Sequence, residues 1–161
     1  MEFNIKKIKV LVLDVDGTLT DGKVYISNEG EFVKAFNVKD GYGIKEILPT
    51  WNITPIIVTG RTSEIVTKRA KELGIKHVFQ GVTNKLQKLK EICKRLNVDM
   101  SNVAYIGDDL NDLECIEASG FKACPNDAVD EIKQRCDYIS SRCGGCGAVR
   151  EIIDKLISLE K

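Results

Sequence analysis

An unbroken apolar run, residues 10–13, leads directly into the polar segment 14–18, Asp-Val-Asp-Gly-Thr. A continuous run rich in β-branched residues is typical of a strand in a parallel sheet that is covered on both faces. We therefore expect residues 9–13 to form such a strand and to place Asp14 in a crevice at its carboxyl end. Side chains alternate along an extended segment, so Asp16 would point to the same side. Two carboxylates in one pocket repel each other unless a cation or a shared proton lies between them, and the pair predicts a Mg²⁺ site.

A second acidic segment, residues 107–112 (Gly-Asp-Asp-Leu-Asn-Asp), follows another apolar run at 103–106. Either acidic segment alone is explained by a polar turn that ends a strand. Two of them favour a shared site, because the carboxyl ends of parallel strands face one edge of a sheet and ligands bind where the strand order reverses.

Two further strand ends carry groups suited to phosphate. Residues 55–58 end in Thr59-Gly60-Arg61, which offer a hydroxyl and backbone amides just before a helix predicted from about Ser63. Lys85 follows a short strand at 77–79 and a Gln-Gly turn. Other lysines of that stretch are expected to be solvated, but the position of Lys85 in the motif order sets it apart.

The strand-like runs alternate with helical patterns along the whole chain. This order predicts an α/β fold, a three-layer sandwich around a central parallel sheet, with a short fifth strand at 121–123. Apolar residues at helical spacing predict a carboxyl-terminal helix at about 147–158 that packs on the core. A length of 161 residues with 43% hydrophobic content suits one domain, 1–161.

Residues 22–37 predict a β-hairpin, since two alternating segments flank an Asn-Glu-Gly turn. A two-stranded ribbon is marginally stable alone, so its apolar side chains need a partner. The hairpin either folds back on its own core or pairs with hairpins of other subunits, which would remove exposed strand edges; we prefer the second interpretation. After it, a helix is predicted to begin at Asp40 and to end at Pro49.

The motif order, an acidic pair, Thr-Gly, Lys and then Gly-Asp-Asp with a further Asp, resembles the four motifs of the haloacid dehalogenase superfamily of phosphotransferases. The resemblance implies that Asp14 attacks phosphorus to form an aspartyl-phosphate. It implies that Asp16 protonates the leaving alkoxide and later activates water. The implied Mg²⁺ ligands are the side chains of Asp14 and Asp108 and the backbone carbonyl of Asp16. Thr59 and Lys85 are expected to bind the phosphoryl group, with Asp109 and Asp112 as outer supports.

Residues 59–75, Gln80-Gly81, Lys85 and residues 144–151 look like the capless phosphatases of 3-deoxy-D-manno-octulosonate 8-phosphate. In that family four subunits assemble through their hairpins, which implies a homotetramer here. The short interval 18–59 is consistent with the absence of a large cap. Arg61 and Arg69, with Gly60, match positions that lie near the sugar acid or the phosphate in the family, and a guanidinium suits a carboxylate. Arg69 lies two turns beyond Arg61, so one of the two could be a surface charge.

Asn111 departs from the resemblance, because the octulosonate enzymes commonly have Pro there and related phosphatases of nonulosonic acid 9-phosphates commonly have Asn. The eight- and nine-carbon substrates therefore both stay open. A phosphoreceiver-like signalling domain is a further alternative, but such domains carry the phosphoacceptor on the third strand. An inactive scaffold is disfavoured by the intact set of Asp14, Asp16, Lys85 and Asp108.

Six cysteines raise the possibility of a zinc site, formed by Cys143 and Cys146 with Cys124 and Cys136. The spacing lacks the second CxxC knuckle of a zinc ribbon, and we expect reduced thiols in the cytoplasm. Lys and Arg total 24 against 24 for Asp and Glu, so no net field favours nucleic acid. Charges interrupt every apolar run, which argues against a membrane partner. The expected partner is a small sugar-acid phosphate.

Overall fold

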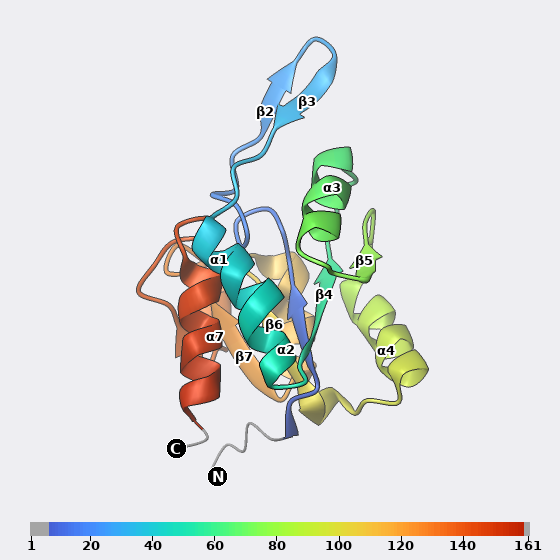
Figure 1. Ribbon diagram of the computed structural model, residues 1–161, viewed down its shortest axis with the longest axis vertical. Coiled ribbons are helices and arrows are strands. Elements are labelled where there is room, and N and C mark those ends of the chain that lie inside the picture. The colour runs from blue at the N-terminus through green and yellow to red at the C-terminus, as the bar shows by residue number, and fades with distance from the viewer. Residues whose placement is uncertain (1–6, 160–161) are drawn as a thin grey trace.

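The computed structural model describes residues 7–159, and its centre is a six-stranded parallel sheet (Figure 1). The strands lie in the order β5, β4, β1, β6, β7, β8. Their bounds are β1 (Val10–Leu13), β4 (Thr54–Val58), β5 (His77–Phe79), β6 (Val103–Ile106), β7 (Phe121–Cys124) and β8 (Tyr138–Ile139). The predicted α/β class with a central parallel sheet is confirmed, and β8 is an addition that the sequence pattern did not reveal.

Helices cover both faces of this sheet, so the molecule has three layers (Figure 1). In β1, Leu11 and Leu13 belong to one buried apolar cluster, whereas Val10 and Val12 belong to another. Side chains of α3 and α7 complete the first cluster, and side chains of α4, α5 and α6 complete the second. The helices are α1 (Val38–Tyr42), α2 (Leu48–Thr50), α3 (Glu64–Glu72), α4 (Lys85–Leu96), α5 (Leu113–Ala118), α6 (Asp130–Lys133) and α7 (Ala148–Ser158).

The strand order reverses beside β1, and this places the functional segments. β1 pairs with β4 on one side and with β6 on the other. In parallel sheets, the loops that follow such neighbouring strands form a crevice at the carboxyl edge. The segments that begin at Asp14, Thr59 and Gly107 therefore leave the sheet at the same edge.

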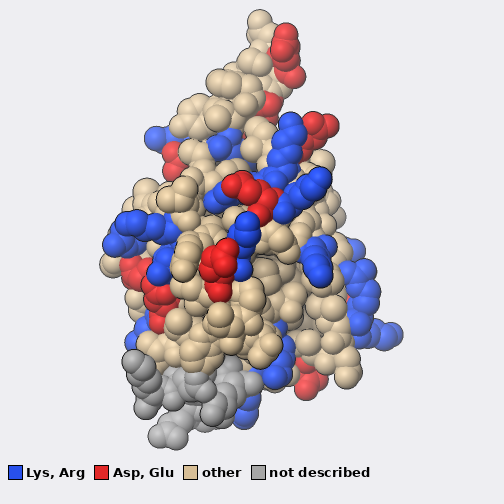
Figure 2. All heavy atoms as spheres, in the orientation of Figure 1, with Lys and Arg blue, Asp and Glu red and all other residues tan. Residues whose placement is uncertain are grey.

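The predicted hairpin is present as β2 (Tyr25–Ser27) and β3 (Gly30–Val33), which pair antiparallel and project away from the sheet (Figure 1). It does not fold back on the core. Ile26 is 68% exposed and Phe32 is 63% exposed. In the space-filling view the projection is largely tan, with acidic atoms near its tip (Figure 2).

The helix after the hairpin begins and ends elsewhere than predicted. It begins at Val38, because the Asn37 side chain caps it by accepting a hydrogen bond from the Lys39 amide at 2.8 Å. Asp40 does not cap the helix; its carboxylate is buried and accepts a hydrogen bond from the Arg150 amide of α7. A π-helical turn (Gly43–Ile47) joins α1 to α2. Pro49 is the second residue of α2, where the first turn tolerates a residue without an amide proton, and the helix ends at Thr50. No helix within residues 7–159 is both long and apolar enough to cross a membrane.

Candidate active site

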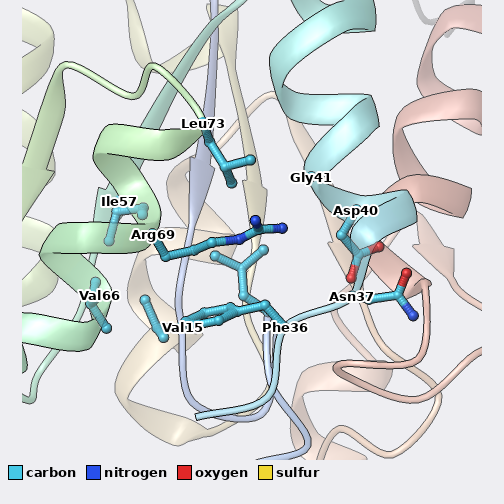
Figure 3. Close-up of a pocket in the computed structure, with 10 residues that line it drawn as sticks. Val15, Phe36, Asn37, Asp40, Gly41, Ile57, Val66, Arg69 and Leu73 are labelled. Atoms are coloured by element: carbon cyan, nitrogen blue, oxygen red, sulfur yellow. The ribbon is translucent and has the colours of Figure 1, made fainter. Parts of the chain in front are cut away.

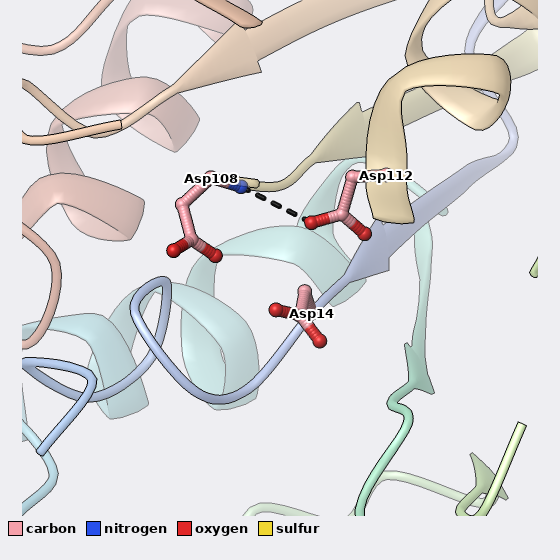
Figure 4. Close-up of side chains that lie close together, drawn as sticks. All are labelled: Asp14, Asp108 and Asp112. Carbon is pink, nitrogen blue, oxygen red and sulfur yellow. Dashed lines mark hydrogen bonds between the residues drawn. The ribbon is translucent and has the colours of Figure 1, made fainter. Parts of the chain in front are cut away.

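Three carboxylates converge at the carboxyl edge of the sheet (Figure 4). Asp14 follows β1, Asp108 follows β6, and Asp112 ends a short 3₁₀ turn after Asp108. One oxygen from each side chain lies within 4.8 Å of the others. Asp14 and Asp112 are buried, and Asp108 is half-buried. The two acidic segments of the sequence therefore meet as predicted.

Asp112 holds the other groups of the cluster in place. Its Oδ1 accepts hydrogen bonds from Lys85 Nζ at 2.8 Å and from the Tyr105 hydroxyl at 2.7 Å. Its Oδ2 accepts from the Asp108 amide at 3.2 Å (Figure 4). Since both Asp112 oxygens are engaged, the oxygens of Asp14 and Asp108 are the ones better placed to hold a metal ion.

Lys85 supplies the buried positive charge beside the cluster. It is the first residue of α4, whose cap is the Asn84 side chain. Its Nζ lies 2.9 Å from Asp14 Oδ1 and 2.8 Å from Asp112 Oδ1. Burial alone would lower the pKa of Lys85, but the two carboxylates outweigh it and raise the pKa above its ordinary value. Lys85 is therefore held as an ammonium group.

One ammonium does not balance three carboxylates. Burial, and then the charge of Asp112, raise the pKa of Asp14; burial, and then the charges of Asp14 and Asp112, raise the pKa of Asp108. A divalent cation that prefers oxygen ligands would offset this repulsion. The donor set therefore fits Mg²⁺.

Glycines allow these segments to approach closely. Gly17 has φ +90°, and a Cβ atom there would lie 2.0 Å from Asp108 Oδ2. The next residue, Thr18, donates its hydroxyl to Asp108 Oδ1 at 3.1 Å. On the other side, a Cβ atom on Gly144 would lie 2.0 Å from the Gly17 carbonyl oxygen. The late Gly-rich segment thus packs on the loop that carries Asp14 and Asp16.

Asp16 lies beside the cluster and contacts the hairpin, which the sequence did not predict. Its Oδ1 accepts a hydrogen bond from Lys34 Nζ, and its Oδ2 lies 3.9 Å from Arg61 Nε. Lys34 also pairs with Glu31 Oε1 at 2.8 Å, and Arg61 Nη2 lies 3.5 Å from the same oxygen. The only hint in the sequence is a lysine within the largely apolar stretch 32–36.

Thr59 is buried at the end of β4, where the sequence placed it. Its amide donates to the Phe79 carbonyl at 2.9 Å, and its carbonyl accepts from the Val82 amide at 3.1 Å. Gly60 is exposed, and a Cβ atom on it would lie 4.0 Å from Asn111 Nδ2. The Thr-Gly segment and the second acidic segment are therefore neighbours at the carboxyl edge.

Arg69 and Asp109 make contacts elsewhere. Arg69 lies over the Phe36 ring at 5.6 Å, pairs with Glu72 at 2.9 Å and lines a second pocket that also contains Asp40 (Figure 3). Asp109 is exposed, and its side chain accepts from the Leu110 amide at 2.7 Å. Within residues 7–159, neither side chain forms a hydrogen bond or ion pair with the Asp14 cluster, so their predicted roles stay predictions. Among the described residues, no three cysteines come together as metal ligands, and none is in a disulfide.

Comparison with known proteins agrees with this geometry. A model of the haloacid dehalogenase-like hydrolase family matches residues 78–143. The 3-deoxy-D-manno-octulosonate 8-phosphate phosphatase KdsC of Salmonella typhi is 45% identical over 94% of this chain and 80% of that protein. The chain belongs to this phosphatase family.

Solved structures of family members superpose closely on this chain. The Moraxella catarrhalis 3-deoxy-D-manno-octulosonate 8-phosphate phosphatase, crystallised with magnesium, phosphate and KDO, has a TM-score of 0.92 and 41% identity, covering 97% of this chain and 89% of that one. The cobalt-bound Haemophilus influenzae phosphatase has a TM-score of 0.92 and 37% identity, covering 97% and 91%. The resemblance noted in the motifs is thus confirmed, and the chain is an enzyme of the phosphatase type.

Proposed function

We propose that this protein is a Mg²⁺-dependent phosphatase that hydrolyses 3-deoxy-D-manno-octulosonate 8-phosphate. The observation that carries the proposal is the convergence of Asp14 and Asp108, with Lys85 bonded to Asp14, at the carboxyl edge of the sheet, in a chain 45% identical to an octulosonate 8-phosphate phosphatase. Buried carboxylates that repel one another are costly to fold unless the site uses them.

Asp14 is the nucleophile. Its carboxylate oxygen forms a bond to phosphorus while the bond from phosphorus to the sugar oxygen breaks, which leaves an aspartyl-phosphate and a free sugar acid. The side chains of Asp14 and Asp108 and the backbone carbonyl of Asp16 would hold Mg²⁺. The bound ion supplies positive charge that offsets the charge of the phosphoryl oxygens.

Lys85 orients the nucleophile and offsets its charge. Its Nζ donates to Asp14 Oδ1 and to Asp112 Oδ1, so Asp14 presents its other oxygen to phosphorus. The Thr59 hydroxyl and the Gly60 amide bind the phosphoryl group, since this chemistry depends mainly on positioning and electrostatics.

Asp16 is the acid and the base. It gives a proton to the departing sugar oxygen in the first step and takes a proton from the water that attacks the aspartyl-phosphate in the second. Arg61, half-exposed and close to Asp16, is a candidate for binding the substrate. Arg69 stays a candidate for binding the sugar carboxylate, as the family resemblance implies.

A nonulosonic acid 9-phosphate is the alternative substrate. Asn111 supports this alternative, because related phosphatases of nonulosonic acid 9-phosphates commonly have Asn where the octulosonate enzymes commonly have Pro. Both substrates are keto-sugar acids with a terminal phosphate, so an arginine-lined pocket suits either one.

A homotetramer assembled through the hairpins is part of the proposal. Exposed apolar side chains on a two-stranded ribbon support it, because such a ribbon is marginally stable without further packing. A single domain over 1–161 and a cytoplasmic location stay predictions from the sequence.

Phosphate release from the eight- and nine-carbon substrates, with Mg²⁺ and with a chelator, tests the proposed function. We expect many turnovers on the eight-carbon substrate, none with the chelator, and none in the Asp14→Asn variant. Preferred turnover of the nine-carbon substrate would transfer the assignment to the alternative. One phosphoryl group retained per chain without turnover would instead indicate a phosphoreceiver, and no reaction with any sugar-acid phosphate would overturn the proposal.

A further inference from the structure

Lys34 is buried in a segment whose neighbours are exposed. Phe32, Val33 and Ala35 are all exposed, whereas the side chain of Lys34 is 1% exposed. A lysine side chain is almost never fully buried unless its ammonium group is paired, because removing the charge from water is costly. We therefore expect the groups that pair with the buried ammonium group to fix the direction of the Lys34 side chain.

Two carboxylates meet the ammonium group of Lys34. Asp16 Oδ1 accepts a hydrogen bond from Nζ, and Glu31 Oε1 lies 2.8 Å from Nζ. Arg61 reaches both carboxylates more loosely, at 3.9 Å from Asp16 and 3.5 Å from Glu31. The Arg61 side chain is 49% exposed, so its contacts are the weaker ones. The buried contact between Lys34 and Asp16 is the firm link between the hairpin and the loop that follows β1.

This contact leaves one oxygen of Asp16 for the reaction. With Oδ1 held by Lys34, the carboxyl group cannot turn freely, and Oδ2 keeps one direction at the edge of the crevice. Proton transfer needs the donor and acceptor within hydrogen-bond reach, so a fixed orientation contributes directly to the rate.

We propose that Lys34 is a positioning residue for Asp16, and that it sets the orientation of the acid through its buried ion pair, with Glu31 holding Lys34 from the hairpin side. The inference rests on the proposed function, because it takes Asp16 as the group that protonates the leaving oxygen. It adds a role for the hairpin within each subunit, separate from its role in assembly.

The nature of the leaving group separates this role from a structural one. A sugar alkoxide leaves poorly and takes the proton of Asp16 as its bond to phosphorus breaks, whereas p-nitrophenolate leaves without needing that proton. The ratio kcat/KM reports the steps up to departure of the leaving group. Misplacement of Asp16 therefore lowers kcat/KM for a sugar phosphate much more than for p-nitrophenyl phosphate.

The test compares Lys34→Met with wild type on 3-deoxy-D-manno-octulosonate 8-phosphate and on p-nitrophenyl phosphate, both with Mg²⁺. We expect kcat/KM to fall about 30-fold or more for the sugar phosphate and less than about threefold for the aryl phosphate. Lys34→Arg, which keeps the charge and the donors, is expected to recover most of the loss. Lys23→Met is the matched control, since Lys23 lies on the same hairpin stem and its side chain is 73% exposed. This substitution is expected to leave kcat/KM unchanged on both substrates.

A second comparison asks whether Lys34 acts through Asp16. In an Asp16→Asn background, Lys34→Met is expected to change kcat/KM for 3-deoxy-D-manno-octulosonate 8-phosphate less than about twofold, instead of about 30-fold, because the group that it positions is absent. Equal losses on both substrates would overturn the inference, as would a full effect of Lys34→Met in the Asp16→Asn background. If Lys34→Met does not fold, Glu31→Gln replaces it, with a smaller loss in the same direction expected. Wild-type protein inactive on both substrates would instead overturn the proposed function.

Discussion

The Asp14 cluster and the hairpin differ in which side chains they bury: the cluster buries charged side chains, whereas the hairpin exposes apolar ones. In the cluster, charged groups are buried, and the contacts that hold Lys85 and Asp112 come from the same chain. In the hairpin, apolar groups such as Ile26 and Phe32 are largely exposed, although the Tyr25 ring meets the Phe32 ring edge-on. The contacts of the cluster therefore lie within one chain, whereas the hairpin offers the surface on which we propose that subunits assemble.

The two regions also differ in how single substitutions act on them. Removing one member of a buried ion pair leaves the other charge without a partner and costs about 3–5 kcal/mol. Removing an exposed apolar side chain costs the isolated chain little, but forfeits about 1.5–3 kcal/mol where an assembly would bury it. Lys34 links the two regions, because it lies at the base of the hairpin and bonds Asp16, two residues after Asp14.

The largest effect is expected for Asp14→Asn. The amide keeps the shape of the side chain but is not a nucleophile, so turnover should fall by at least about 10⁴-fold. Removing one of three crowded carboxylates should leave the fold intact. Phosphate release and thermal unfolding measure the two quantities, and activity above a few per cent in pure protein would remove Asp14 from its role.

Lys85→Met tests whether the buried ion pairs of the Asp14 cluster stabilise the fold. Asp14 and Asp112 would lose their shared ammonium, and we expect the free energy of unfolding to fall by about 3–5 kcal/mol in denaturant titrations. Lys88→Met is the matched control on the same helix, because Lys88 pairs with an exposed Glu91 and its loss should cost less than about 1 kcal/mol. Equal losses in the two variants would mean that the buried ion pairs contribute no more to the free energy of unfolding than the exposed pair does.

The double variant Ile26→Glu with Phe32→Glu tests whether the exposed apolar side chains of the hairpin form an interface between subunits. Charges on surfaces that an assembly buries should dissociate the proposed tetramer at micromolar concentration, while the free energy of unfolding of each subunit changes by less than about 1 kcal/mol. Light scattering gives the mass, with Glu29→Gln at the turn as control. An unchanged mass, or a wild-type monomer, would refute the assembly.

Local patterns were enough to predict the sheet and the convergence of the acidic segments. The continuous apolar runs of β1 and β6 reveal strands buried on both faces, and strand ends share one edge of a parallel sheet. The hairpin was predictable for the same reason, because alternation and a turn are local signals. Strand β8 has only two residues, too few to form a pattern.

Contacts between distant segments were not predictable in this way. Asp40 resembles a helix cap in the sequence, but its carboxylate instead accepts a hydrogen bond from the Arg150 amide, a residue 110 positions later. The hydroxyl of Tyr105 lies within an apolar run and gives no sign of its contact with Asp112. The link from Lys34 to Asp16 likewise depends on how the hairpin leaves the sheet.

Asp40 is a buried carboxylate without a lysine bonded to it. We expect its ionisation to lower the free energy of unfolding, and this is the smallest of the effects that we predict. Burial raises its pKa to about 6, although Arg69, Arg142 and Arg150 oppose the shift. The folded protein therefore binds a proton there more tightly than the unfolded chain does, and stability falls as pH rises from about 4 to about 6. Asp40→Asn keeps an oxygen for the Arg150 amide but cannot ionise.

We expect Asp40→Asn to be more stable than wild type by roughly 1–3 kcal/mol at pH 7.5 and nearly equal to it at pH 4. Denaturant unfolding at the two values measures this difference, with Asp99→Asn, an exposed carboxylate, as control. A variant that is less stable than wild type at pH 7.5 would mean that Arg69 and its neighbours compensate Asp40 fully. Asp40 would then be a charge-balanced site, unlike the Asp14 cluster, in which one ammonium group does not balance three carboxylates and a cation from outside the chain is needed.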